Sequence, residues 1–282
     1  MVVNYTKEYI NVSGFASERL ITSGKPVIVV TMPRSGTAYI RNVISTHLNL
    51  KLVYKYQYAS GPRLKYFINH NTLFNEITRK RVYVAGHFPP SHYNLQLLKL
   101  SGVKKIVVHF RDPRDALLSW NNHICKPKII KSELSQIQLL ASRNSIACNH
   151  YKLSPHEQID WLIDNYFCDL IEWMYDWLVA KSKNEYIDIL LTDFDMLKNT
   201  PLAFFNKIIN FFNYDKFISN ASQLPNPRIN PLKYNFNLGQ SGNYLQEFND
   251  QQILKTHDIL CEKFQSKPYL LQKYGWLKKN SN

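Results

Sequence analysis

The sequence lacks the long apolar segments that would tie the chain to a membrane or a secretory route. No apolar run among the 282 residues reaches the roughly 20 residues that a bilayer-spanning helix needs. The segment Met1 to Leu20 is mixed in polarity and has no apolar core of signal-peptide length. These absences predict a cytoplasmic protein without a membrane partner.

Cysteine is also scarce, and its spacing matches neither a metal site nor a redox pair. None of the four cysteines forms a C-x-x-C pair, and Cys148 with His150 is too small a set for a metal. We therefore expect free thiols in a reducing compartment and no metal cofactor. The four positions are Cys125, Cys148, Cys168 and Cys261.

Acidic residues are outnumbered by basic ones. The chain has 21 Asp and Glu against 35 Lys and Arg, which gives a formal net charge of +14. This imbalance favours an acidic partner, and nucleic acid, an anionic membrane and a polyanionic cofactor all satisfy it. The basic residues are scattered rather than clustered, which argues against nucleic acid.

One stretch near the start predicts an anion site. Val27 to Val30 is a short β-branched run typical of a buried strand, and Pro33 and Gly36 mark a tight loop after it. Ala38 to Leu48 then has the apolar spacing of a helix. Loop amides and a helix N-terminus together attract an anion. The loop adds a cation and two hydroxyl groups: Arg34, Ser35 and Thr37.

This loop is not a Walker A loop, because the first glycine and the lysine of G-x-x-x-x-G-K-S/T are absent. The NTPase interpretation therefore lacks its phosphate-binding lysine. An ordinary strand-to-helix turn remains the alternative from the loop alone.

A second strand-to-helix turn makes the anion site more specific. Lys105 to Phe110 reads as a buried strand, and Arg111 follows it directly. Pro113 stands where a first helical turn would begin, with Asp112 as a candidate N-cap. Ligands of open α/β sheets bind at the carboxyl ends of the strands. Two such basic turns predict a ligand with anionic groups at both ends.

Three motifs in this order resemble the sulfotransferases that use 3′-phosphoadenosine 5′-phosphosulfate (PAPS). Pro33 to Thr37 resembles the family's 5′-phosphosulfate loop. Arg111 to Ser119 is similar to its R-x-P-R-D-x-x-x-S element, which grips the nucleotide 3′-phosphate. Val84 to Pro90 resembles the strand that carries the catalytic histidine in K-T-H-x-P form. The likeness extends more weakly to the C-terminal region, so it covers about Lys25 to Trp276.

The resemblance implies an α/β fold of the P-loop-NTPase-like type, a three-layer sandwich with a mainly parallel central sheet flanked by helices. It implies an N-terminal extension over 1–24 and a single sulfotransferase domain over 25–282. It also implies an enzyme that moves a sulfuryl group from PAPS to a hydroxyl or amine of a small-molecule acceptor. The product would be PAP (3′-phosphoadenosine 5′-phosphate), and no metal is required.

The resemblance assigns catalysis to two residues. His87 lies at the end of the strand pattern Arg81 to Gly86 and would be the base, since histidine accepts a proton near neutral pH. Arg34 would stabilise the leaving PAP by charge alone, because arginine stays protonated. The family's lysine two residues before the histidine is Ala85 here. Three other histidines are interpreted as structural: His92, His109 and His123.

The resemblance also assigns the nucleotide contacts, with several departures from the family pattern. Alanine replaces the loop's second threonine, and Asn237 and Leu238 replace two cations of the family's C-terminal glycine loop. Tyrosine or phenylalanine replaces an aromatic partner at three places: Tyr39, Phe194 and Tyr244. The implied cofactor-binding residues are Arg34, Ser35, Gly36, Thr37, Ala38, Tyr39, Arg111, Ser119, Phe194, Leu238 and Gly239.

The rest of the chain predicts further helices and strands. Ile159 to Val179, Leu202 to Phe212 and Asp250 to Phe264 have helical apolar spacing, and Tyr186 to Leu191 reads as a strand. Lys51 to Arg81 allows three interpretations: a nucleic-acid stacking surface, a wall of the acceptor pocket, or a half-buried strand and loop.

Two other function classes remain alternatives at this point. One is a P-loop-like kinase or nucleotide-binding protein without sulfotransfer activity, and the other is a basic nucleic-acid-binding protein. A carboxylate such as Glu76 is the rival candidate for the base. The sequence does not indicate the acceptor, the oligomeric state, or whether residues 125–154 act as a lid.

Overall fold

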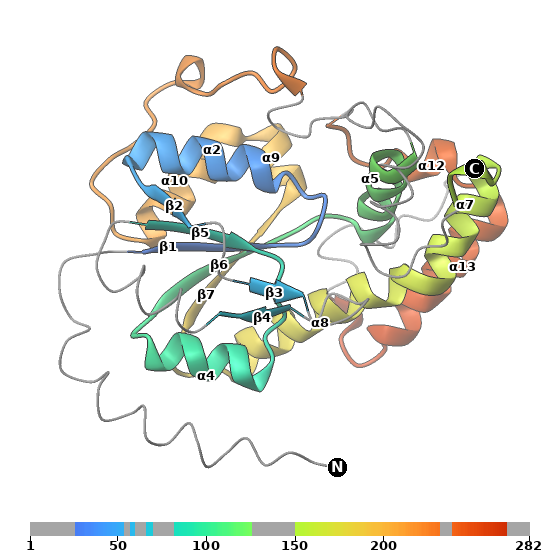
Figure 1. Ribbon diagram of the computed structural model, residues 1–282, viewed down its shortest axis with the longest axis horizontal. Helices are drawn as coiled ribbons and strands as arrows, with labels where there is room; N and C mark the ends of the chain where they lie inside the picture. The colour runs from blue at the N-terminus through green and yellow to red at the C-terminus, as the bar shows by residue number, and fades with distance from the viewer. Residues whose placement is uncertain are drawn as a thin grey trace.

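The computed structural model has a five-stranded parallel sheet at its centre, in the order β2-β5-β1-β6-β7 (Figure 1). The strands are β1 (Val27–Thr31), β2 (Lys51–Val53), β5 (Val82–Gly86), β6 (Lys105–Phe110) and β7 (Asp188–Asp193).

The structure describes residues 26–53, 57–59, 66–69, 82–125, 150–231 and 239–269. The predicted extension over 1–24, the candidate Leu238, the rival base Glu76 and most of segment 125–154 lie outside these residues.

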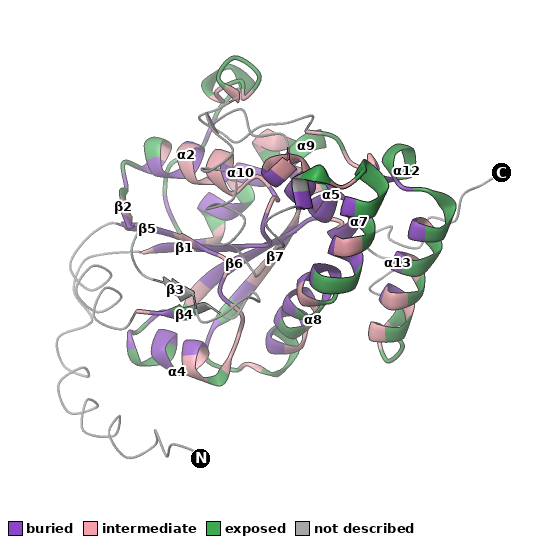
Figure 2. Ribbon diagram, turned by 45° about the vertical axis from the view of Figure 1, so that its right-hand side comes forward, coloured by how far each residue is buried: buried purple, intermediate pink, exposed green. Residues whose placement is uncertain are grey.

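The central strand β1 is buried on both faces. Val27 and Val29 pack into one apolar cluster, and Ile28 and Val30 pack into a second cluster on the other side. A strand covered on both faces needs apolar residues at every position, which is why its sequence is a continuous β-branched run. Figure 2 shows β1, β5 and β6 buried along nearly their whole length.

Helices cover both faces of the sheet. On the face of Val27 and Val29 lie α2 (Thr37–Leu48) and α10 (Pro201–Phe211). On the opposite face lie α4 (His92–Leu100) and α8 (Cys168–Lys183). Figure 1 shows these two layers above and below the strands. The predicted three-layer α/β fold is therefore confirmed.

Further helices lie beyond the carboxyl ends of the strands, at the right of Figure 1. They are α5 (Pro113–Cys125), α7 (Pro155–Leu162), α12 (Tyr244–Glu247) and α13 (Asp250–Lys263). The remaining described elements are α9 (Phe194–Asn199), the short pair β3 (Gln57–Ala59) and β4 (Tyr66–Ile68), and the 3-10 turns His150–Lys152 and Ala221–Gln223.

The long helix predicted over 159–179 is present but differs from the simple pattern. It begins at Pro155, where Ser154 and Glu157 form a capping box, and it runs to Lys183. A π-helical segment, Ile163–Phe167, separates α7 from α8. Such a segment adds a residue to one turn, so the apolar positions on its two sides can still face the same core.

One other boundary differs from the sequence prediction. The strand predicted from Tyr186 begins at Asp188, because the preceding Asn184 side chain accepts the N–H groups of Tyr186 and Ile187 and holds them in a turn. The short helix α9 follows β7, and Asp193 caps it by accepting the Met196 N–H at 2.7 Å.

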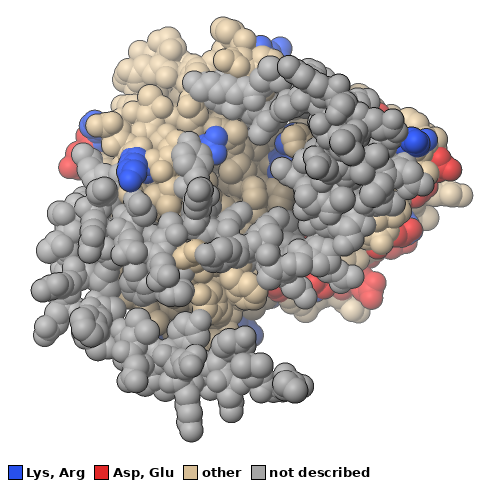
Figure 3. Space-filling view, viewed as in Figure 1, with Lys and Arg blue, Asp and Glu red and all other residues tan. Residues whose placement is uncertain are grey.

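The surface of the described residues carries charges of both signs. In Figure 3 the visible Lys and Arg side chains are scattered, and many visible acidic side chains lie toward α7, α8 and α13. Within the described ranges, no helix is long and apolar enough to traverse a bilayer.

Candidate active site

Three loops meet at one edge of the sheet because β5, β1 and β6 are adjacent and parallel. Val30 pairs with Gly86, and Thr31 pairs with His109, so the strands end at similar heights. His87 follows β5, the loop Met32 to Gly36 follows β1, and Arg111 follows β6. The residues predicted to act together are thus carried by three neighbouring strand ends.

The loop after β1 has the backbone shape of an anion receptor. Arg34 and Gly36 both adopt the left-handed conformation, with φ of 64° and 93°. Gly36 is needed there, since a Cβ atom would also lie 3.2 Å from Leu197 Cδ2. The helix α2 begins at Thr37, and the first N–H groups of a helix have no partner inside it. Such free amides give the start of a helix a partial positive charge, which attracts an anion.

A buried histidine of the neighbouring strand β6 binds the main chain of the loop. His109 on β6 is fully buried, and its Nε2 lies 3.0 Å from the Ser35 carbonyl oxygen. A carbonyl only accepts, so Nε2 carries the proton, and Nδ1 accepts from the Thr192 hydroxyl at 3.0 Å. Burial lowers the pKa of His109 to about 3, and the nearby Arg111 charge acts in the same direction. The imidazole is therefore neutral, as a structural histidine.

Ser35 uses its hydroxyl inside the loop. Its Oγ donates to the Met32 carbonyl oxygen at 2.6 Å, and the side chain is fully buried. The hydroxyl that the sequence predicted as a ligand contact is therefore used inside the loop.

His87 is held in one tautomer by the end of β1. Its Nδ1 lies 2.7 Å from the Thr31 carbonyl oxygen, so Nδ1 is the donor. In a neutral imidazole the lone pair is then on Nε2. The Thr31 hydroxyl lies 3.3 Å from the same Nδ1 and 2.7 Å from the Thr37 hydroxyl. One buried residue thus links the histidine to the start of α2.

Two arginines connect the loop to α5 and to the C-terminal segment. Arg34 Nε donates to the Ser119 hydroxyl at 3.3 Å. Arg111 donates from Nη1 to the Arg34 carbonyl oxygen at 3.1 Å and from Nη2 to the Gln240 carbonyl oxygen at 2.7 Å. Arg111 is 8% exposed, and within the described residues its Nε has no hydrogen-bond partner. A buried guanidinium with an unused N–H is suited to bind an anion.

The surroundings of Arg111 balance a desolvated cation. Burial lowers the pKa of Arg111, whereas the carboxylates of Asp115, Asp112 and Asp195 raise it. The guanidinium also stacks on Phe194, with 4.4 Å from its Cζ to the ring centre. Arginine remains charged even when shifted, so the group keeps its positive charge.

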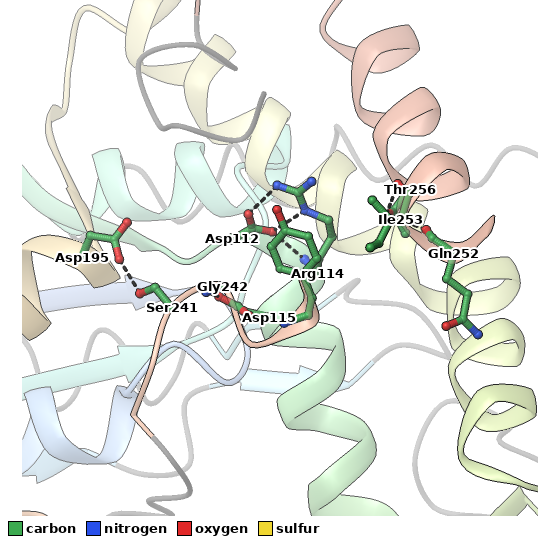
Figure 4. Close-up of polar contacts among 10 residues, drawn as sticks. Asp112, Arg114, Asp115, Asp195, Ser241, Gly242, Gln252, Ile253 and Thr256 are labelled. Carbon is green, nitrogen blue, oxygen red and sulfur yellow. Dashed lines mark hydrogen bonds and ion pairs between the residues drawn. The ribbon is translucent and has the colours of Figure 1, made fainter. Parts of the chain in front are cut away.

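Carboxylates hold the C-terminal glycine loop against α5 and α9. Asp115 accepts the N–H groups of Gly242 at 2.7 Å and Tyr244 at 3.2 Å, and Asp195 accepts the Ser241 hydroxyl (Figure 4). Burial raises the pKa of Asp115, although the Arg111 charge opposes that shift. The glycine loop is thereby fixed beside Arg111.

Glycine is used twice in that loop for its conformation. Gly239 and Gly242 have φ of 62° and 81°, in the left-handed region that side chains disfavour. Next to them, Arg114 pairs with Asp112 and lies over the Tyr244 ring, with its Cζ 4.0 Å from the ring centre.

A family model for the sulfotransferase domain matches residues 25–268. The chain belongs to the sulfotransferase family. No match was found among curated protein sequences.

Solved structures share the fold of this sulfotransferase. Mouse sulfotransferase SULT7A1 complexed with PAP is 16% identical, with a TM-score of 0.54 and coverage of 93% of this chain and 95% of that chain. Retinol dehydratase in complex with androsterone and inactive cofactor PAP is 14% identical, with a TM-score of 0.51 and coverage of 91% and 85%. At these identities the likeness shows the fold alone.

Most residues predicted for the site lie in one contact network. The Tyr39 ring packs edge-on against Phe205 of α10, with centroids 5.7 Å apart, and its N–H donates to the Gly36 carbonyl oxygen at 3.0 Å. Leu238 lies outside the described residues. The residues in the network are Arg34, Ser35, Gly36, Thr37, His87, Arg111, Ser119 and Phe194, with Ala38 in the first turn of α2 and Gly239 in the glycine loop.

Sequence reasoning missed the supports of this network. Thr31 stands just before the first motif and carries no motif-level signal of its role. Asp115 is the aspartate of the R-x-P-R-D-x-x-x-S element, but no role was predicted for it from the sequence. Within the described residues, no group of three or more His, Cys, Asp or Glu side chains could hold a metal. None of the three described cysteines, Cys125, Cys168 and Cys261, forms a disulfide.

The depressed pKa of His109 predicts acid sensitivity. As pH falls below 6.5, the unfolded chain binds a proton that the folded protein does not bind until about pH 3. The contribution of His109 to the free energy of unfolding is therefore fully present above pH 6.5. It falls toward pH 3, by up to about 1.4 kcal/mol per pH unit. Urea unfolding measured at several pH values between about 7 and about 4 gives this slope.

The non-titrating variant His109→Gln separates this contribution from general acid effects. We expect it to be less stable than wild type near pH 7 but to lose stability less steeply on acidification. His92→Gln, at an exposed position, should keep the wild-type slope. Identical slopes for wild type and His109→Gln would contradict the assignment.

Proposed function

We propose that this protein transfers a sulfuryl group from PAPS to a hydroxyl or amine of a small-molecule acceptor. His87 is the base in this proposal, and Arg34 stabilises the leaving PAP. Membership of the sulfotransferase family supports the reaction class. The solved relatives named above are in complex with PAP, which supports the choice of nucleotide.

The observation that carries the proposal is the state of His87. The bond from Nδ1–H to the Thr31 carbonyl oxygen leaves the lone pair on Nε2, which is what a general base requires. The histidine is partly exposed and stands beside the anion loop rather than within the core. A base at this place can take the proton of an acceptor that attacks a group bound to the loop.

The loop and Arg111 fit the two anionic ends of the nucleotide. Backbone N–H groups of Gly36 and Thr37, with the start of α2, would hold the 5′ end. Arg111, through its unused Nε, and Ser119 would hold the 3′-phosphate. PAPS supplies the activated sulfuryl group. Because sulfuryl transfer resembles phosphoryl transfer, the protein contributes mainly position and charge.

In this proposal Arg34 acts on the charge that develops as the sulfuryl group is transferred. Its Nε bond to Ser119 fixes the guanidinium between the loop and α5. Arginine keeps its proton, so it stabilises the oxygen of the breaking bond electrostatically and does not act as an acid.

The competing function classes differ in the ligand that stabilises the protein. A ligand that binds the native state raises the melting temperature. PAP should raise it most, whereas a larger shift with ATP would favour a kinase and a larger shift with a short RNA would favour nucleic-acid binding.

Replacing the proposed base tests the reaction directly. His87→Asn keeps similar size and loses the base, so transfer of labelled sulfate from PAPS to any accepted substrate should fall by roughly two to four orders of magnitude. PAP affinity, measured by calorimetry, should stay within about twofold. The acid limb of kcat/KM against pH should be present in wild type and absent in the variant. Near-wild-type turnover would assign the base to another residue, such as Glu76.

Substitution of Arg34 distinguishes transition-state stabilisation from binding. Arg34→Ala should lower kcat far more than it raises the KM for PAPS. Arg34→Lys should retain part of the rate because a cation remains. If kcat is unchanged and only KM rises, Arg34 is a binding residue and not a catalytic one.

The 3′-phosphate assignment predicts a change in nucleotide selectivity. Arg111→Ala also removes the bonds to two loop carbonyls, so binding of PAP and of adenosine 5′-phosphosulfate should both weaken. The ratio of the two affinities should still fall by about 10- to 100-fold, since only PAP loses a charged hydrogen bond. Gln240→Ala is the control, because Arg111 contacts only the main chain there. An unchanged ratio would refute the assignment.

A further inference from the structure

Two buried tryptophans of α8 point their indole N–H groups at the segment that carries His87. Trp173 Nε1 donates to the His87 carbonyl oxygen at 2.8 Å and to the Phe88 carbonyl oxygen at 3.1 Å. Trp177, one turn later, donates to the Phe88 carbonyl oxygen alone, at 3.2 Å. Both rings are almost fully buried, at 2% and 0% exposure. Two helix side chains therefore bind the main chain just beyond β5.

These bonds lie where the main chain leaves β5 and its carbonyl groups lose their partners in the sheet. The ladder of β5 ends at Gly86, so the carbonyl groups of His87 and Phe88 leave the sheet and need other donors. Trp173 donates to the first of these carbonyl groups, which belongs to His87, the residue whose side chain is the proposed base. Its ring is fixed by its neighbours, with 6.0 Å to the Phe110 centroid and 6.3 Å to the Trp177 centroid. A rigid donor thus holds the peptide of His87.

His87 is consequently fixed at two points. Its carbonyl oxygen is held by Trp173 from the layer of α8, and its Nδ1–H is held by the Thr31 carbonyl oxygen at the end of β1. The main-chain bond sets where the Cα–Cβ bond starts, and the side-chain bond sets the ring orientation and tautomer. Loss of the first would let the peptide rotate and weaken the second, because the Nδ1–O distance of 2.7 Å leaves little slack.

We propose that Trp173 is a positioning residue for His87: the indole N–H of Trp173 keeps the His87 imidazole in the Nδ1–H tautomer, with the lone pair on Nε2. This inference rests on the proposed function, and it assigns Trp177 no such role. Trp173 touches neither reactant and acts through the main chain.

A matched pair of variants tests the proposal. Trp173→Phe and Trp177→Phe remove the same atoms from the same buried helix face, and each removes one indole donor. Only Trp173→Phe removes the bond to the His87 carbonyl oxygen. We expect kcat to fall about tenfold in Trp173→Phe, the effect of one net hydrogen bond, and about twofold or less in Trp177→Phe. The KM for PAPS and the PAP affinity should not change in either variant.

The pH profile separates positioning from catalysis. Trp173→Phe should keep the acid limb of kcat/KM at a reduced rate, whereas His87→Asn should lose that limb. Equal loss of kcat in the two tryptophan variants would overturn the proposal, as would a loss confined to PAP affinity.

A spectroscopic readout is independent of turnover. In protein labelled with 15N-histidine, the ring signals of His87, assigned by comparison with His87→Gln, should show the Nδ1–H tautomer in wild type and in Trp177→Phe. They should show a smaller share of that tautomer in Trp173→Phe. If the tautomer is unchanged in Trp173→Phe, the inference fails even if the enzyme is active; if it shifts but His87→Asn is fully active, the proposed base fails instead.

Where phenylalanine prevents folding, a closer isostere preserves the test. Incorporating 3-benzothienylalanine at position 173 or 177 keeps the ring size and replaces the N–H by sulfur. The same contrast in kcat and tautomer is expected between the two positions, and its absence would overturn the proposal.

Discussion

The carboxyl ends of β5, β1 and β6 meet at one edge because the central strand β1 pairs in parallel with both neighbours. Everything proposed for the site depends on this pairing. His87, the loop Met32 to Gly36, and Arg111 are far apart in the sequence, yet each is the continuation of one of these strands. The register of this pairing, with Val30 opposite Gly86 and Thr31 opposite His109, sets the heights of the three loops relative to one another.

Burial of charge is the second constraint, and it explains how the site keeps its shape. Arg111 lies in the interior, where an isolated cation would be costly, and it is compensated by two loop carbonyls and by nearby carboxylates. The same carbonyls belong to the anion loop and to the glycine loop, so compensating the charge also joins the two loops. Asp115 fixes the glycine loop from the other side. The cation proposed to bind phosphate thus also helps to organise its own binding site.

The sequence predicted those parts of the fold that follow from local patterns. The run Lys105–Phe110 is a strand with the predicted bounds, and the bond from Arg114 N–H to Asp112 Oδ1 at 2.9 Å agrees with the expected N-cap. Contacts that join distant segments were not predictable, such as the bond between Asp115 and Gly242, which are 127 positions apart. The hydroxyl of Ser35 was assigned to the ligand because the motif indicates residue type, whereas its hydrogen bond to Met32 depends on the loop's final geometry. The two positions that depart from the family pattern, Ala38 and Tyr39, lie in the first turn of α2, which begins at Thr37.

A crystal structure of the complex with PAP tests the central claim most directly, because that claim concerns the place where the nucleotide binds. The account predicts the 5′-phosphate against the N–H groups of Gly36 and Thr37, and the 3′-phosphate within hydrogen-bond distance of Arg111 Nε, the buried donor without a partner among the described residues. It also predicts that His87 Nδ1 keeps its bond to the Thr31 carbonyl oxygen. PAP bound away from this strand edge, or a 3′-phosphate that does not contact Arg111, would contradict the account.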